Sequence, residues 1–196
     1  MRQLILATRN SHKTREFAAI LGNLCEVRDL RDYPEIGEIE ETGASFEENA
    51  VIKAVHVSRQ LPGLVVADDS GLEVDLLNGA PGIYSARYAG EHSTDAENIA
   101  KLLGELTKPG PLTEPVAARF RCCLALAEEG EVRKTFEGIV EGIIVPVPRG
   151  TLGFGYDPVF QPEGFDQTFA ELSPAEKNRI SHRSRAIESL RREWLG

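Results

Sequence analysis

Two adjacent aspartates follow a short apolar run in the segment Val65-Val66-Ala67-Asp68-Asp69-Ser70-Gly71. The apolar residues are typical of a strand buried on both faces, and ligands of open α/β sheets bind beyond the carboxyl ends of such strands. We therefore expect Asp68 and Asp69 at that edge, followed by a turn. Because two buried like charges need a cation or donors to offset them, the pair indicates a divalent metal site. A solvated Asp-Asp-Ser-Gly turn is the plainer alternative.

A second group of polar residues follows the first apolar segment of the chain. Residues 3–8 are predicted as a strand, and Asn10 or Ser11 as the cap of a helix that ends near Gly22. A strand that leads into a helix N-terminus presents backbone N–H groups to an anion, and Arg9, His12 and Lys13 lie at the same end. The glycines of a Walker loop or a dinucleotide fingerprint are missing here. This segment alone therefore fits a phosphate site and a capped helix with a solvated basic turn equally well.

Further candidate residues lie at the start of later helices. Residues 45–48 form a capping box, which opens a helix with Asn49, Lys53 and His56 on one face, and Glu41 comes just before it. Near the other end, residues 177–185 hold a basic cluster in an acidic chain, for which a solvated surface is the usual explanation. The glycine-rich aromatic segment 150–160 suits stacking on a planar ligand, or else filling the core at a junction of lobes.

Periodicity predicts the elements that position these residues. We expect strands at 24–31 and 72–76, a tight turn at Asn78-Gly79, and a long hairpin of 116–126 with 132–144. Helices are predicted after the capping boxes that begin at Thr94 and Ser173, and a last helix from Ser181. The fold is therefore predicted as α/β: a long, twisted mixed sheet flanked by helices, with one domain over residues 1–196 and an active cleft between two lobes.

Composition excludes several classes of partner. The chain has 196 residues, 41% of them hydrophobic and 27% charged, with a net charge of -9. That charge argues against binding a nucleic-acid polymer, because such binding requires Lys and Arg to neutralise many phosphates; a small polyanion with its own magnesium is compatible. No window approaches the about 20 apolar residues of a membrane span, so we expect a cytoplasmic protein. Cys25, Cys122 and Cys123 lack zinc-site spacing and are interpreted as reduced structural thiols.

Taken together, these segments resemble the inosine triphosphate pyrophosphatase family, whose enzymes hydrolyse ITP, dITP and XTP to the monophosphate and pyrophosphate. The motifs occur in the family's order from the first strand to the last helix. Leu152 and Ser184 stand where the family often has glycine. The residues that carry the resemblance are Thr8-x-Asn10-x-x-Lys13-x-x-Glu16-Phe17, Glu41-Thr42-Gly43-x-Ser45-Phe46-x-Glu48-Asn49-Ala50-x-x-Lys53-Ala54, Ala67-Asp68-Asp69-Ser70-Gly71-Leu72, Gly79-x-Pro81-Gly82-x-Tyr84-Ser85-Ala86-Arg87, Gly153-Phe154-Gly155-Tyr156-Asp157-Pro158-x-Phe160 and Glu176-Lys177-Asn178-x-Ile180-Ser181-His182-Arg183.

The resemblance implies roles for individual residues. Glu41 and Asp69 would hold Mg²⁺, Asp69 would accept the proton of the attacking water, and Asp68 and Lys53 would complete the catalytic group. A homodimer is implied, with residues 84–88 as a candidate contact. The implied substrate-binding residues are Thr8, Arg9, Asn10, Ser11, His12, Lys13 and Ser70 and, around the purine base, Phe154, Gly155, Tyr156, Asp157, Lys177, His182 and Arg183.

Two other functions share part of this pattern of residues. A phosphatase with an aspartyl nucleophile normally uses Asp-x-Asp, and here Ser70 and Gly71 follow the adjacent pair, so the spacing fails. A nucleotide-binding regulatory protein without turnover is disfavoured by the full set of acidic and basic residues, and an assay for pyrophosphate release separates it from an enzyme.

Overall fold

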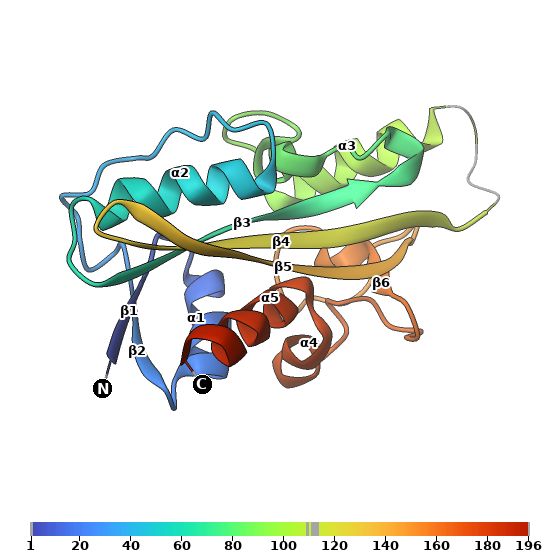
Figure 1. Ribbon diagram of the computed structural model, residues 1–196. Helices are drawn as coiled ribbons and strands as arrows, with labels where there is room; N and C mark the ends of the chain where they lie inside the picture. The colour runs from blue at the N-terminus through green and yellow to red at the C-terminus, as the bar shows by residue number, and fades with distance from the viewer. Residues whose placement is uncertain (1, 109, 111–113, 196) are drawn as a thin grey trace. The chain divides into compact units, whose positions relative to one another are not determined.

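The computed structural model describes residues 2–108, 110 and 114–195 (Figure 1). Single-turn segments of 3₁₀-helix occur at Asp75–Leu77 and Asp157–Val159, a longer one at Gly82–Arg87, and a π-helical turn at Arg191–Leu195. The strands are β1 Arg2–Leu6, β2 Cys25–Asp29, β3 Leu64–Val74, β4 Val116–Glu128, β5 Glu131–Ile144 and β6 Phe160–Pro162. The α-helices are α1 Ser11–Leu21, α2 Phe46–Ser58, α3 Asp95–Thr107, α4 Pro174–Ile180 and α5 His182–Leu190.

The described strands form one mixed sheet in the order β2-β1-β3-β4-β5-β6. β1 pairs in parallel with both β2 and β3, whereas β6 pairs antiparallel with β5. The predicted α/β fold with a mixed sheet is therefore confirmed. The chain groups into two compact units, one made of the residues up to Asp69, Cys122–Gly138 and the residues from His182, the other of Ser70–Arg121 and Ile139–Ser181. The single domain and the cleft between lobes stay predictions.

In the first unit, helices cover both faces of the strands (Figure 1). One apolar cluster joins Val66 of β3 to Phe17 of α1 and Ile187 of α5, and another joins Val65 and Ala67 to residues of α2. Successive residues of a strand point to opposite faces, so the even-numbered residues of this part of β3 face α1 and α5, and the odd-numbered ones face α2. This alternation decides where the two aspartates point.

The predicted turn after Asp68 and Asp69 is wrong. β3 continues through Ser70 and Gly71 to Val74, so the separate strand expected at 72–76 is its second half. Leu72 and Val74 lie two positions apart, on the same face of the strand, and both are buried, which holds the chain in the sheet. The turn comes later, at Asn78 and Gly79, where both φ angles are positive. β1 ends at Leu6, opposite Val66. The aspartates therefore lie within β3, just past the end of its neighbour.

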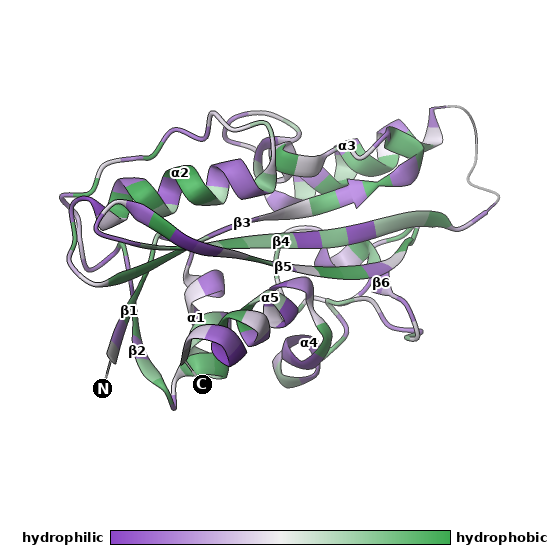
Figure 2. Ribbon diagram, in the orientation of Figure 1, coloured by the Kyte–Doolittle hydropathy of each residue, from purple (hydrophilic) through white to green (hydrophobic). Residues whose placement is uncertain are grey.

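The second unit has a core of its own. Leu102 and Leu106 of α3 pack into the same cluster as Phe120, Phe160 and Phe169. Figure 2 shows hydrophobic and hydrophilic residues interleaved along α3, as expected for a helix with one buried side. The rings of Phe120 and Phe160 meet edge to face with centroids 4.7 Å apart, a favourable aromatic geometry. This core carries the loop that holds Phe154 to Asp157.

The predicted helix starts are confirmed, with one difference in detail. Asn10, not Ser11, caps α1, and complete capping boxes begin α3 at Thr94 and α4 at Ser173. At α2 the Ser45 side chain caps the helix as expected, but Glu48 accepts from Ala44 N–H instead of the cap residue.

Two predictions from composition also have an outcome in the described part of the chain. Cys25, Cys122 and Cys123 are buried thiols outside any disulfide, as expected for structural cysteines. No α-helix there is long and apolar enough to cross a membrane.

Candidate active site

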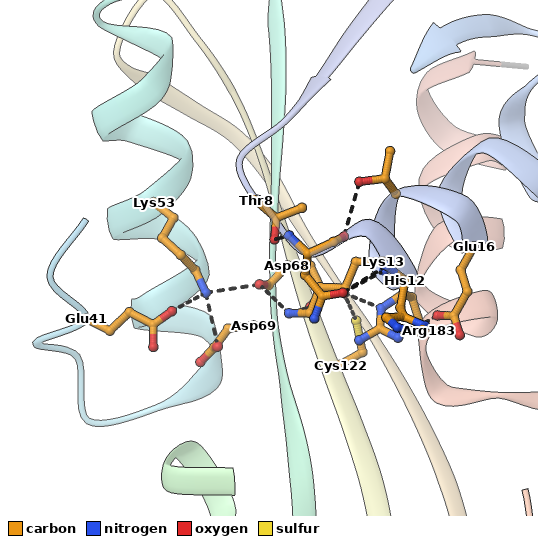
Figure 3. A network of polar contacts seen from close by, with 12 residues as sticks. Thr8, His12, Lys13, Glu16, Glu41, Lys53, Asp68, Asp69, Cys122 and Arg183 are labelled. Atoms are coloured by element: carbon orange, nitrogen blue, oxygen red, sulfur yellow. Dashed lines mark hydrogen bonds and ion pairs between the residues drawn. The ribbon is translucent and has the colours of Figure 1, made fainter. Parts of the chain in front are cut away.

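Two lysines from different helices converge on one carbonyl oxygen of β3 (Figure 3). Lys13 Nζ in α1 donates to the main-chain oxygen of Asp68 at 3.3 Å, and Lys53 Nζ in α2 donates to the same oxygen at 3.0 Å. The two helices pack on opposite faces of β3, so the cations approach from both sides. The two ammonium groups are therefore held close together at one point of the strand.

The Asp68 side chain belongs to the α1 and α5 face and is fully buried. Its Oδ1 pairs with Lys13, while its Oδ2 accepts from Arg183 Nε at 2.7 Å and from the Cys122 thiol at 3.2 Å. Arg183 also pairs with Glu16 at 2.5 Å. Burial alone would raise the pKa of Asp68, but Arg183 and Lys13 outweigh it and hold that pKa well below its ordinary value. Asp68 is therefore an ionised anchor for cations.

Asp69 faces α2 and has a different environment. Its Oδ1 accepts from Lys53 Nζ at 3.1 Å, and the same ammonium lies 2.6 Å from Glu41 Oε1. Burial raises the pKa of Asp69 above its ordinary value, although Lys53 opposes the rise. Asp69 Oδ2 is buried and has no hydrogen-bond partner in the described part of the protein. Burying a carboxylate oxygen without a hydrogen-bond partner costs free energy, so this oxygen indicates that a ligand, water or cation binds it in the working site.

The two carboxylates therefore do not lie side by side, and the argument from their mutual repulsion is wrong. Period-two alternation sends them to opposite faces, and each has its own cations. The case for a metal rests on other observations. The main one is Asp69 Oδ2, which is buried without a hydrogen-bond partner in the described part of the protein.

The residues around Lys53 suit a hard cation that is shared with a ligand. Glu41 and Asp69 supply carboxylate oxygens, which Mg²⁺ prefers, and Mg²⁺ usually takes only one or two of them together with substrate phosphates. No cluster of three or more His, Cys, Asp or Glu ligands occurs among the described residues. Glu41 and Asp69 could therefore hold a hard cation that takes its other oxygens from a bound ligand.

The segment before α1 lies close to this network and is partly occupied by its own hydrogen bonds. Asn10 Oδ1 accepts from the N–H groups of His12 and Lys13 at 2.9 and 3.3 Å. Thr8 Oγ1 accepts from Asn10 N–H at 3.1 Å, and the Arg9 guanidinium donates to the carbonyl of Ile36. The cap thus uses two of the N–H groups that were expected to face an anion.

Two more predicted substrate-binding residues lie in partly exposed positions. Ser11 begins α1, and Ser70 follows Asp69 in β3; both side chains are half-buried.

In the second unit, the predicted base-binding residues form a compact group. Lys177 Nζ lies 2.6 Å from Asp157 Oδ2 and 4.8 Å from the centre of the Phe154 ring. Asp157 also accepts from Phe154 N–H at 2.9 Å. A Cβ on Gly153 would come within 2.0 Å of the Asp157 carboxylate, so this turn requires glycine there. The loop conformation therefore holds a lysine against an aromatic ring.

Neighbouring residues of that loop serve its structure. Tyr156 is buried and its hydroxyl donates to the Ser85 carbonyl at 2.9 Å, while Gly155 N–H donates to Asp95 at 2.6 Å. Their contact with a purine base stays a prediction.

His182 and Arg183, also predicted at the base, belong to the first unit and are buried. Arg183 contacts Asp68 and Glu16, so the structure gives it a role in anchoring β3 to α1. Glu16 and Cys122 were not predicted as site residues. Glu16 could have been found, because it follows Lys13 by three positions and so lies on the same side of α1. Nothing in the sequence separates Cys122 from an ordinary core cysteine.

Comparisons with known proteins identify the family of this chain. The sequence model of the Ham1 family matches residues 4–193. A protein of Bacillus licheniformis named dITP/XTP pyrophosphatase is 54% identical over 97% of this chain and 96% of its own length, and one of Bacillus subtilis with the same name is 51% identical over 97% and 96%.

Solved structures show the same fold. The Ham1 protein of Staphylococcus aureus superimposes with a TM-score of 0.85 at 42% identity, over 97% of each chain. A HAM1 protein from Coxiella burnetii gives 0.86 at 43% identity, over 97% of this chain and 96% of that one. These matches span nearly the whole sequence and agree with the resemblance carried by its motifs. The chain therefore belongs to the Ham1 family.

Proposed function

We propose that this protein hydrolyses non-standard purine nucleoside triphosphates, such as dITP, XTP and ITP, to the nucleoside monophosphate and pyrophosphate, and so removes them from the nucleotide pool. The observation that carries the proposal is the identity of 54% and 51%, over nearly the full chain, with proteins named dITP/XTP pyrophosphatase. The convergence of Lys13 and Lys53 beside Asp69 supplies the chemistry that such an activity needs.

In the proposed reaction, a water oxygen bonds to the α-phosphorus while the bond from that phosphorus to the α–β bridging oxygen breaks. Negative charge builds up on the leaving pyrophosphate, and positive groups must offset it. Lys13 and Lys53 are the cations assigned to this task, together with the polar residues before α1. Losing one such contact commonly costs about 3 kcal/mol of transition-state stabilisation.

Asp69 is assigned as the acceptor of the proton that the attacking water loses. Lys53 holds the carboxylate in place through Oδ1, so that Asp69 orients the attacking water, which a bound cation would acidify. Oδ2 is the oxygen available for this work, because it is the one without a partner among the described residues. Asp68 is assigned a supporting role: it fixes Lys13 and does not meet the substrate, since its side chain is fully buried.

We further propose that the enzyme depends on Mg²⁺, with Glu41 and Asp69 as the protein ligands. When bound, the ion would offset phosphate charge and acidify the attacking water. The hard oxygen donors of Glu41 and Asp69, which lie together around the Lys53 ammonium, support this assignment.

The purine base is assigned to the group formed by Phe154, Asp157 and Lys177. Hypoxanthine and xanthine carry a carbonyl at the 6-position, where adenine carries an amino group. A fixed donor such as the Lys177 ammonium donates to the carbonyl oxygen, whereas adenine would set donor against donor, at a cost of roughly 1–3 kcal/mol. The ion pair with Asp157 holds this lysine in one place.

The test is a panel of nucleotides assayed for pyrophosphate and, separately, for orthophosphate. We expect pyrophosphate from dITP, XTP and ITP, with kcat/KM about 5- to 150-fold above that for ATP, the equivalent of roughly 1–3 kcal/mol. Removing Mg²⁺ with EDTA should abolish turnover and adding it back should restore it. Release of orthophosphate instead would indicate cleavage at another bond and would contradict the proposal, as would equal rates for ATP. Sizing the protein in solution tests the implied homodimer.

A further inference from the structure

We infer that Asn49 is a positioning residue for Glu41, and thereby sets the affinity of the magnesium site. This inference rests on the proposed function, because it takes Glu41 as a ligand of the ion. Asn49 lies one helical turn before Lys53 in α2 and is fully buried, and the resemblance assigns it no role.

The segment that carries Glu41 has no sheet or helix to hold it. Residues 37–43 form neither element, so hydrogen bonds to side chains must fix their path. Gly43 N–H donates to Asn49 Oδ1 at 2.8 Å, and Ala44 N–H donates to Glu48 Oε2 at 2.8 Å. These bonds tie the segment to the first turns of α2.

The fit at this contact is tight. A Cβ on Gly43 would come within 2.7 Å of both Asn49 Oδ1 and Glu48 Cβ, so only glycine lets the segment approach the helix so closely. Glu41 lies two residues before Gly43, and its Oε1 is 2.6 Å from the Lys53 ammonium. Because Asn49 and Lys53 are spaced by one helical turn, the helix that holds the segment also supplies the cation which meets Glu41.

The other end of the Asn49 amide strengthens the case. Its Nδ2 is buried without a hydrogen-bond partner in the described part of the protein. An apolar residue of similar size would avoid the cost of a buried donor left unpaired, so stability alone does not explain an asparagine here. What Asn49 supplies is an acceptor oxygen for Gly43.

The experiment measures cation binding without turnover. Mn²⁺ replaces Mg²⁺, and its bound fraction is followed by electron paramagnetic resonance in the presence of a dITP analogue with a methylene group in place of the α–β bridging oxygen. For Asn49→Ala we expect Mn²⁺ to bind at least about 10-fold more weakly, the usual effect of removing a group that orients a metal ligand. In the activity assay the Mg²⁺ concentration for half-maximal rate should rise equally, while kcat at saturating Mg²⁺ is largely regained.

Ser58→Ala is the matched control. Ser58 is buried in the same helix and its hydroxyl accepts from another glycine, Gly130 N–H, at 3.1 Å, at the turn between β4 and β5. It should lower the melting temperature and leave Mn²⁺ binding unchanged. Gly43→Ala disrupts the same contact at its other residue and should weaken Mn²⁺ binding as Asn49→Ala does. This variant tests the inference if Asn49→Ala does not fold.

The outcomes separate this inference from the proposed function. If Glu41→Gln weakens Mn²⁺ binding but Asn49→Ala and Gly43→Ala do not, the positioning role is overturned and the metal site stands. If Glu41→Gln has no effect, both the ligand assignment and the inference fail, while pyrophosphate release from dITP by the wild-type protein still tests the activity itself.

Discussion

Asp68 and Asp69 are neighbours in β3, yet their carboxyl groups lie on opposite faces of the strand, in environments that shift their pKa values in opposite directions. Figure 3 shows Asp68 among Lys13, Arg183 and Cys122, and Asp69 beside Lys53 and Glu41. Separation of the pKa values of two nearby carboxylates is how enzymes assign them different roles. Here one is suited to hold cations and the other to accept a proton.

Asp69→Asn should abolish turnover with little cost to folding. The substitution removes the proton acceptor and keeps the shape of the side chain, and it removes a charge that burial already disfavours. We expect kcat to fall by at least about 100-fold, while binding of the methylene analogue of dITP partly survives. Steady-state kinetics and calorimetry measure the two quantities. Near-normal hydrolysis by this variant would refute the assignment of Asp69.

Asp68→Asn, unlike Asp69→Asn, should lower the free energy of unfolding strongly. It leaves Arg183, which is 2% exposed, without one of its carboxylate partners, and breaking a buried pair in this way typically costs about 3–5 kcal/mol. Urea unfolding of the two Asn variants side by side measures the difference. Because the substitutions are chemically identical and adjacent, Asp69→Asn is the control. Equal stability of the two variants would show that the Asp68 network is not an anchor.

Local sequence signals predicted much of this fold. The caps at Asn10, Ser45 and Thr94 and the turn at Asn78 follow from short-range chemistry, in which a side chain or a backbone angle decides the structure within a few residues. The break expected after Asp69 failed for a physical reason. Ser70 and Gly71 favour a turn by composition, but pairing within a sheet and burial of Leu72 outweigh that local preference.

The environments of the site residues could not be predicted to the same extent. Lys13, Lys53 and Asp69 were expected near one another from the resemblance, but the division of the two aspartates between faces depends on the strand's register against α1 and α2. The pairing of Arg183 with Asp68 spans 115 positions of sequence. Such long-range contacts are set by packing, and no local pattern reports them.

Lys177→Gln should weaken discrimination between bases more than it weakens turnover of dITP. The lysine is the proposed donor to the 6-carbonyl, held 2.6 Å from Asp157 Oδ2, and removing it relieves the conflict with adenine. We expect the ratio of kcat/KM for dITP to that for dATP to fall about 10-fold, the equivalent of one misplaced hydrogen bond. Asp95→Asn, which perturbs the bond to Gly155 N–H in the same loop, is the control. A ratio that stays constant while both rates fall would contradict the role.

Asp29 should contribute a measurable part of the stability of the protein in acid. Burial would raise its pKa, but hydrogen bonds from Arg31 and Thr14 outweigh this and lower the pKa from 3.8 to about 2. Because the folded-state pKa is the lower one, the stabilisation is complete above the unfolded value and is lost as the pH falls from about 4 through about 2. At 1.36 kcal/mol per pKa unit, the contribution is on the order of 2 kcal/mol.

Urea unfolding of the wild-type protein and of Asp29→Asn, each at pH 6 and at pH 2.5, measures this contribution to the free energy of unfolding. Asp29→Asn should lose less stability than the wild-type protein over that interval, because the substituted side chain no longer titrates. Asp32→Asn removes an exposed carboxylate three positions further along and controls for the change in net charge. Parallel loss of stability in the wild-type protein and Asp29→Asn would mean that the contacts with Arg31 and Thr14 do not lower the pKa of this aspartate, and that the acid sensitivity of the fold arises elsewhere.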